Sequence, residues 1–162
     1  MINKYVFMFK ELIQLIKWLF SGNPNDYEGL ELVQMKYFPF KNYSAMSWCG
    51  RIITREPDKI DDVTINHETI HLKQAQCYGT WFSYYLRYCI EWLKGNPFTK
   101  PFRSAYYTIP YEVEAYANEN DFNYTFVYNP DLIRLKYNLK NRKKLFKSFK
   151  NVSAWLDYLR NL

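Results

Sequence analysis

Two histidines and one glutamate stand close together in the stretch NHETIHLKQA, residues 66–75. His67 and His71 are the only histidines of the chain, and Glu68 directly follows the first. On a helix, residues four apart project from one face, with roughly 5–6 Å between their Cβ atoms. That spacing lets both imidazoles reach one zinc ion, while Glu68 can take a proton from a water molecule on the metal. The pattern predicts a hydrolytic zinc site, and the alternative is a pair of hydrogen-bonded core histidines.

A zinc hydrolase needs a third protein ligand, which here must be a carboxylate or, less often, a cysteine. The segment 106–121 offers four carboxylates, which are Glu112, Glu114, Glu119 and Asp121. On a helix, Glu112 and Glu114 project about 200° apart, so both cannot face one metal. An alanine shares a helix face with each of them and would allow close helix packing, so the spacing leaves both open.

The HETIH stretch followed by a helical E-x-x-A resembles the gluzincin metallopeptidases. More closely, Asn66–Gln74 and Pro110–Glu119 are similar to the N-H-E-x-I-H-x-x-Q and E-x-E-A-Y-A-N-E segments of a group of small bacterial proteins. The resemblance covers roughly residues 30–125. It implies a zincin-like fold, Zn²⁺ as cofactor and a peptide or protein as substrate. It also implies Glu112 as the third ligand, with Glu114 as the alternative.

One departure from the resembled families concerns the support of the histidines. Tyr116 stands where the larger gluzincin families place an aspartate or asparagine, a residue that often orients a metal-bound histidine. The candidates to replace that residue are Glu119, Asn118 and Asp121.

A second departure concerns the transition state, because no histidine remains to stabilise an oxyanion. Tyr107 stands where the small bacterial group commonly has an arginine, and Arg103 is nearby in the sequence. The candidate oxyanion donors are therefore Tyr106, Tyr107, Tyr116 and Arg103. Residues of these types are more often structural than catalytic.

Helices and two short strands are expected to position these residues. The expected helices cover residues 2–20, about 61–78, 80–94, 103–121 and a last region that opens at Asn129-Pro130, and the expected strands cover 30–36 and 45–55. Aspartates between Asp58 and Asp62 offer an N-cap for the HETIH helix, and Pro110 starts or kinks a segment. Gly50 could mark a bulge in the second strand. The fold class is α+β, zincin-like and mostly helical, with a small sheet and an HExxH helix.

We expect one domain over residues 1–162, which is long enough for one sizeable core. Within it, residues 1–22 form an N-terminal amphipathic helix, 30–125 a metallopeptidase-like core and 126–162 a basic helical extension. Residues 134–150 hold eight basic residues and no acidic one. Apolar residues at helical spacing among them favour a solvated helix face. The sequence therefore argues against a nucleic acid as partner.

The helix over residues 2–20 has one narrow polar stripe on a mostly apolar surface. This pattern favours packing into the protein, with interfacial membrane binding as the alternative. No uncharged run approaches the ~20 residues of a membrane span, and no secretory signal is convincing. The three cysteines are far apart, which argues against a disulfide framework. The expected location is cytoplasmic, with peripheral membrane contact as an alternative.

Together these features predict a zinc-dependent metallopeptidase in which Glu68 assists the attack of a zinc-bound water on a peptide bond. The strand at 47–55 is a candidate edge with which an extended peptide could pair. The rival hypothesis is a non-catalytic zinc protein with the same ligands. In that protein Cys49, Cys77 or a tyrosine would close the fourth position of the metal.

Overall fold

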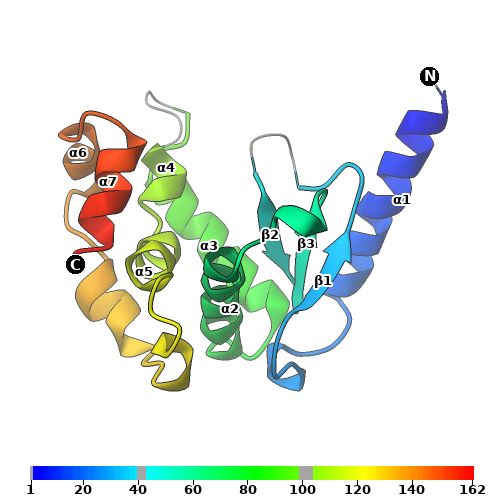
Figure 1. Cartoon of the computed structure of the whole chain (residues 1–162), viewed down its shortest axis with the longest axis horizontal. Helices are drawn as coiled ribbons and strands as arrows, with labels where there is room; N and C mark the ends of the chain where they lie inside the picture. Colours follow the sequence, from blue (N-terminus) through cyan, green and yellow to red (C-terminus); the bar gives the residue numbers. More distant parts are fainter. Residues whose placement is uncertain (1, 40–42, 99–103) are drawn as a thin grey trace. The chain divides into compact units, whose positions relative to one another are not determined.

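Helices and short strands follow one another along the chain in the computed structural model, which describes residues 2–39, 43–98 and 104–162 (Figure 1). The helices are α1 Ile2–Leu19, α2 Asp62–Gln76, α3 Trp81–Lys94, α4 Ser104–Tyr107, α5 Pro110–Asn118, α6 Arg142–Lys147 and α7 Val152–Leu159, and the strands are β1 Glu31–Gln34, β2 Ala45–Trp48 and β3 Arg51–Thr54. They form two units, Met1–Phe82 and Ser83–Leu162. The described residues are mostly helical with one small sheet, which confirms the α+β class. The single domain with three segments stays a prediction.

The sheet belongs to the first unit and has the strand order β1-β3-β2. β3 pairs in parallel with β1 and antiparallel with β2. The expected strand over 45–55 is therefore two strands, because Cys49 and Gly50 take positive φ angles of 49° and 78° and reverse the chain. Two such residues form the tight hairpin turn that suits the twist of a sheet. A Cβ at Gly50 would overlap the ring of Tyr27, so the turn requires glycine there.

The position of β3 corrects the expectation of a substrate-binding edge at residues 47–55. Arg51–Thr54 lies between two neighbours, and the edges of the described sheet are β1 and β2. A central strand has its backbone groups paired on both sides, so it cannot accept an added strand. Only residues 47 and 48 of the segment 47–55 belong to β2, which is an edge strand of the described sheet.

One face of the sheet packs against α1. Ile53 of β3 is buried in a cluster with Leu15 of α1, and Trp18 and Met46 pack around them. The indole Nε1 of Trp48 donates a hydrogen bond of 2.9 Å to the Leu15 carbonyl. Among the described side chains of α1, Leu15 alone is buried. The expected packing of this helix into the protein is therefore confirmed only for the side that carries Leu15. Figure 1 shows its N-terminal turns projecting beyond the strands.

The opposite face of the sheet carries Ile52 and Thr54, which are also buried because successive side chains of a strand alternate between faces. α2 packs next to β2, and Figure 1 shows α1 and α2 on opposite sides of the sheet. α2 begins where the Asp61 carboxylate accepts a hydrogen bond of 2.8 Å from the Thr64 backbone N–H. Such an N-cap satisfies a helix N–H that would otherwise lack a partner. The predicted HETIH helix is thus confirmed with its capping aspartate.

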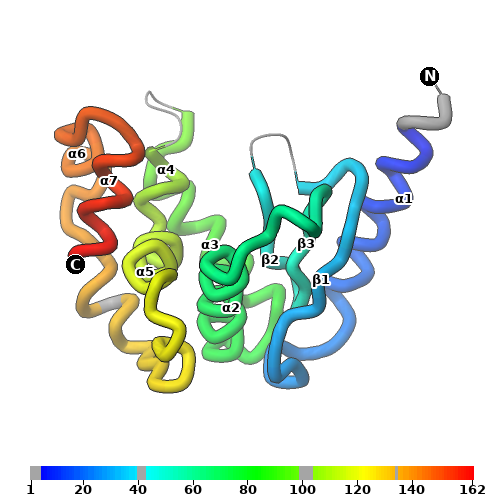
Figure 2. The backbone as a smooth tube through the Cα atoms, in the orientation of Figure 1, coloured from blue at the N-terminus to red at the C-terminus, as the bar shows by residue number. Residues whose placement is uncertain are grey.

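The described part of the second unit is built from helices. Figure 2 follows the chain from α5 through the turn at Tyr124–Phe126 and the segment Ile133–Tyr137 into α6 and α7. Proline is favoured at the first position of a helix because its missing N–H is not needed there, and Pro110 begins α5 as expected. A cluster buried in this unit holds these elements together and contains Val113, Tyr137, Phe146, Trp155 and Leu159.

The basic segment agrees with the expected solvated face. Five of its lysines are exposed, namely Lys136, Lys140, Lys144, Lys147 and Lys150. Arg142 instead turns inward and forms an ion pair of 2.9 Å with Glu91.

No helix in the part of the chain that the structure describes is both long enough and apolar enough to cross a membrane.

Candidate metal centre

The buried face of α2 is polar where the sequence predicts the metal ligands. His67 and His71 are 7 % and 6 % exposed, and Glu68 between them is buried as well. The two imidazole rings lie with their centroids 5.0 Å apart at an interplanar angle of 78°. A polar side chain that is removed from water needs a partner, since burial without one costs free energy. The burial of both histidines therefore requires partners, which either a metal ion or hydrogen bonds within the core can supply.

Gln74 holds His71 in one orientation. The Nδ1 atom of His71 lies 2.7 Å from Oε1 of Gln74, which is fully buried on the next turn of α2. An amide oxygen only accepts hydrogen bonds, so Nδ1 carries the proton and donates. Nε2 is then the nitrogen with a lone pair for a metal, which is the arrangement that supporting residues give to metal-bound histidines. The resemblance to gluzincins instead suggests Glu119, Asn118 or Asp121 for this supporting role, although the position of Gln74 three residues after His71 on a helix is a signal for it.

Glu112 lies on the first turns of α5 and is 2 % exposed. Its Oε1 atom accepts a hydrogen bond of 2.6 Å from the hydroxyl of Tyr88 on α3. Tyr88 in turn stacks on Tyr111, with ring centroids 6.0 Å apart and an interplanar angle of 14°. The aromatic helix α3 thus fixes one carboxylate oxygen of Glu112 through a hydroxyl, as buried tyrosines commonly do.

His67, His71 and Glu112 form one buried group whose ligand atoms all lie within 4.8 Å of one another. Such a group could hold a metal ion. Two imidazoles and one carboxylate are the protein ligands of many catalytic zinc sites. The same donor set also serves iron(II) in non-haem oxygenases, so the donors by themselves admit either metal. The donors present therefore fit the zinc that the motif implies.

Glu114, the alternative third ligand, is held in a different polar cluster of the second unit. Its Oε1 accepts a hydrogen bond of 2.8 Å from Tyr124, and its Oε2 lies 3.4 Å from the hydroxyl of Tyr128. The Nδ2 atom of Asn118 donates to the backbone carbonyl of Glu114 and to the hydroxyl of Tyr137. Burial and then the nearby charge of Glu114 raise the pKa of Tyr124, so this tyrosine stays a donor.

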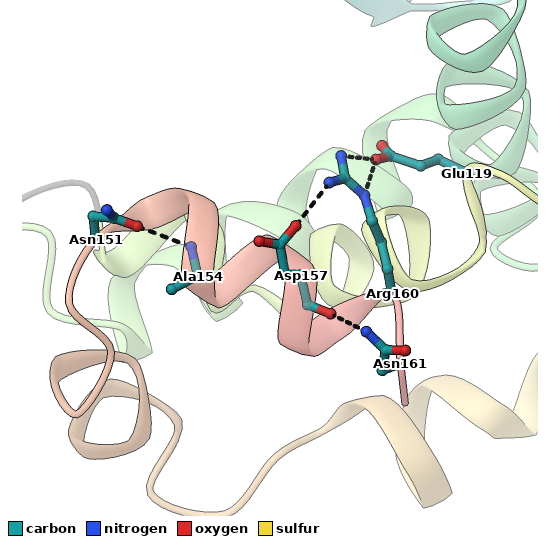
Figure 3. A network of polar contacts seen from close by, with 6 residues as sticks. All are labelled: Glu119, Asn151, Ala154, Asp157, Arg160 and Asn161. Carbon is teal, nitrogen blue, oxygen red and sulfur yellow. Dashed lines mark hydrogen bonds and ion pairs between the residues drawn. The ribbon is translucent and has the colours of Figure 1, made fainter.

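Glu119 and Asp121, two candidates for orienting a histidine, have other contacts. Oε1 of Glu119 accepts hydrogen bonds from Nε and Nη2 of Arg160, at 3.0 and 2.7 Å (Figure 3). Asp121 accepts a hydrogen bond of 3.0 Å from the backbone N–H of Asn123 and so stabilises the turn after α5. Asn118, the third candidate, donates a hydrogen bond to the hydroxyl of Tyr137. These contacts favour structural roles for all three residues.

The tyrosines proposed as oxyanion donors lie in aromatic packing. Tyr107 stacks on Phe146 with the ring planes 5° apart, and its carbonyl accepts a hydrogen bond of 2.9 Å from the indole of Trp155. Tyr106 hydrogen-bonds Tyr116 and lies edge-on to Tyr107. Burial, and next the charge of Glu112, raise the pKa of Tyr116, so its hydroxyl keeps its proton.

Two candidates remain. Glu68 is buried and directly follows His67 on α2, and its catalytic role stays a prediction. Arg103 lies outside the described residues.

Comparison of this chain with family models, with curated proteins and with solved structures finds no match. The resemblance to gluzincins therefore depends on the residues of the two motifs and stays a prediction.

Proposed function

We propose that this protein is a zinc-dependent metallopeptidase with a zincin-like site. The single observation that supports the proposal most is the buried group of His67, His71 and Glu112, together with a buried Glu68 next to the first histidine. Catalytic zinc sites use three protein ligands of these types and keep a fourth position for water or substrate. HExxH on a helix is the pattern that supplies two of the ligands and the base.

The roles of the residues follow from their positions. The chemistry that zinc supplies when bound is polarisation of a carbonyl and acidification of a water. Glu68 accepts the proton of the attacking water and returns it to the leaving amine, which is general base and then general acid catalysis. Gln74 fixes the imidazole of His71, and Tyr88 fixes the carboxylate of Glu112. Burial and next the charge of Glu112 raise the pKa of Tyr116, and this influence of the third ligand makes Tyr116 the donor that we favour for the developing oxyanion.

The second candidate is a zinc protein without catalytic activity. The observation that favours it is the burial of all three ligands, since a structural zinc site is closed to solvent. Cys49, one of the residues that could close the fourth position, is buried, whereas Cys77 is exposed and its thiol contacts the Lys73 carbonyl at 3.3 Å. Both candidates share the ligands and differ in what Glu68 does.

Replacing Glu68 separates the two candidates. We expect Glu68→Gln to keep the zinc content of the wild type and to lower cleavage of a quenched-fluorescent peptide library by at least ~10²-fold, because an amide cannot take the proton. Zinc is measured by elemental analysis, which also distinguishes it from iron. The matched control is Glu28→Gln, since Glu28 is exposed, and it should change neither quantity.

The outcomes of this experiment are distinct. Full peptidase activity in Glu68→Gln would exclude the proposed mechanism even with zinc bound. Zinc in the wild type without cleavage of any library peptide would favour the non-catalytic protein. Absence of any metal after loading with zinc or iron(II) would rule out both candidates and leave His67 and His71 as core residues.

A further inference from the structure

The first helix exposes an unusual amount of apolar surface. Nine large apolar residues between Tyr5 and Phe20 are between 38 % and 74 % exposed, namely Tyr5, Val6, Phe7, Met8, Phe9, Leu12, Ile13, Ile16 and Phe20. Single exposed apolar residues are normal on protein surfaces, but a contiguous apolar area of this kind marks an interaction site. The sequence pattern favours packing of this helix into the protein, and the structure shows that packing for the side of Leu15.

Most of the exposed apolar residues are contiguous around the helix. With Leu15 placed at zero and an advance of about 100° per residue, seven of the nine fall in one arc between about 60° and 180°, whereas Met8 and Phe7 fall at about 20° and 280°. We call this surface the apolar arc of α1. From Tyr5 to Phe20 it extends about 22 Å along the helix axis at 1.5 Å per residue. The sheet contacts the helix through Leu15 and Trp18 on another side, so the arc lies away from the sheet.

The charges beside the apolar arc are positive. On the same wheel Lys17 and Lys10 follow the arc at about 200° and 220°, and both are exposed. The acidic residue of the helix, Glu11, turns toward the protein, where its carboxylate accepts hydrogen bonds of 2.9 and 3.0 Å from the backbone N–H groups of Lys36 and Tyr37. Long lysine side chains at the border of an apolar surface can extend their ammonium groups toward anions while their stems stay in apolar contact.

We propose that the apolar arc of α1 binds the surface of a lipid bilayer that contains anionic lipids, with the helix lying in the plane of the interface. Interfacial helices combine a wide apolar face, aromatic residues and lysines beside that face. The arc is about 120° wide, which exceeds the narrow seam of a helix that pairs with a copy of itself. The bordering lysines complement anionic headgroups. Neither this charge nor this apolar surface depends on the metal group, so the inference is independent of the proposed peptidase activity.

Co-sedimentation of the full chain with lipid vesicles tests the inference. We expect the wild type to bind vesicles of phosphatidylcholine and phosphatidylglycerol more tightly than vesicles of phosphatidylcholine alone, and to bind less tightly as salt is added. The double variant Phe9→Ser/Ile16→Ser should reduce the partition coefficient at least tenfold. Both side chains are exposed, so the variant keeps its fold, which circular dichroism checks.

Two controls sharpen the test. Phe126→Ser/Leu135→Ser removes two apolar residues that are 84 % and 72 % exposed elsewhere, and it should leave binding unchanged. Lys10→Glu/Lys17→Glu should weaken binding to the anionic vesicles several-fold and change binding to the neutral ones little.

Three results would overturn the inference. The first is a wild type that binds neither kind of vesicle. The second is equal binding by the Phe9→Ser/Ile16→Ser variant. The third is a wild-type dimer in analytical ultracentrifugation that this variant converts to a monomer while no vesicles are bound, which would assign the apolar arc to a second copy of the chain.

Discussion

Glu112 and Glu114 stand two residues apart on α5, and the comparison of their surroundings shows what distinguishes a ligand from a structural carboxylate. Both are buried, at 2 % and 0 % exposure. Glu112 accepts a hydrogen bond from the hydroxyl of Tyr88 and belongs to the group with the two histidines. Glu114 contacts two hydroxyls, those of Tyr124 and Tyr128. Burial therefore does not distinguish them, whereas the identity of the neighbouring groups does.

The matched variants Glu112→Gln and Glu114→Gln test this comparison most directly. We expect Glu112→Gln to lose the near-stoichiometric zinc of the wild type, because a neutral amide is a poor replacement for a carboxylate ligand. Glu114→Gln should keep the zinc and only lower the stability of the fold. Elemental analysis after gel filtration measures the metal, and thermal unfolding measures the stability.

The opposite pattern would reverse the assignment. Zinc lost in Glu114→Gln and kept in Glu112→Gln would make Glu114 the third ligand. Zinc lost in both variants would mean that the Glu114 cluster is needed to hold α5 in place. His71→Ala is the reference for a lost ligand and should contain no zinc.

Replacing Gln74 should have a smaller effect on the same site. In Gln74→Leu the imidazole of His71 loses the acceptor that holds its Nδ1 proton, while the volume of the side chain is nearly kept. Loss of such a supporting contact typically weakens metal affinity by about 10–100-fold. Competition with a zinc chelator measures the affinity, and the ¹⁵N shifts of the His71 ring report its tautomer. Unchanged affinity and tautomer would show that Gln74 only packs.

Several helices could be predicted from the sequence because their signals are local, although the helix expected over residues 103–121 is divided into α4 and α5. Asp61 caps α2 and Pro110 begins α5, and both signals act within one turn. The sequence predicts one strand with a possible bulge at Gly50 and not a hairpin, because a cysteine such as Cys49 rarely takes a positive φ angle. Whether β3 is central or at an edge depends on its pairing with β1, which lies far away in the sequence.

The candidate site likewise has a part that local sequence signals predict and a part that depends on contacts between distant residues. The spacing of His67 and His71 predicts their common face, because helix geometry is local. Spacing leaves the choice between Glu112 and Glu114 open, and the family resemblance alone implies Glu112, because the surroundings of the two carboxylates depend on tyrosines 24 residues before the one and 10 residues after the other. Periodicity carries no information on such distant contacts. Periodicity also gives no reason to expect that Arg160, 41 residues farther along the chain, would hydrogen-bond to the carboxylate of Glu119.

Removing a hydroxyl beside Glu114 should affect stability and not the metal. Tyr124→Phe deletes the hydrogen bond of 2.8 Å to the carboxylate. Losing one partner of a buried polar group costs about 1–3 kcal/mol. Urea unfolding of the zinc-loaded protein measures this cost. The companion variant Tyr88→Phe removes the hydroxyl beside Glu112 and should weaken zinc binding in addition, so equal effects of both variants on zinc would remove the distinction between the two carboxylates.

The smallest effect is expected at a third carboxylate, Glu119, which follows α5. Arg160→Met breaks the ion pair of 2.7 Å between Arg160, whose side chain is 38 % exposed, and Glu119, whose side chain is 6 % exposed. Because water reaches the arginine side of the pair, the loss should be about 1 kcal/mol and should shrink at high salt. Zinc affinity should not change. Glu119→Gln should lower stability by a similar amount, and the double variant by little more than either single one, because both remove the same pair. A loss of zinc affinity in Glu119→Gln that Arg160→Met does not share would instead give Glu119 the histidine-orienting role.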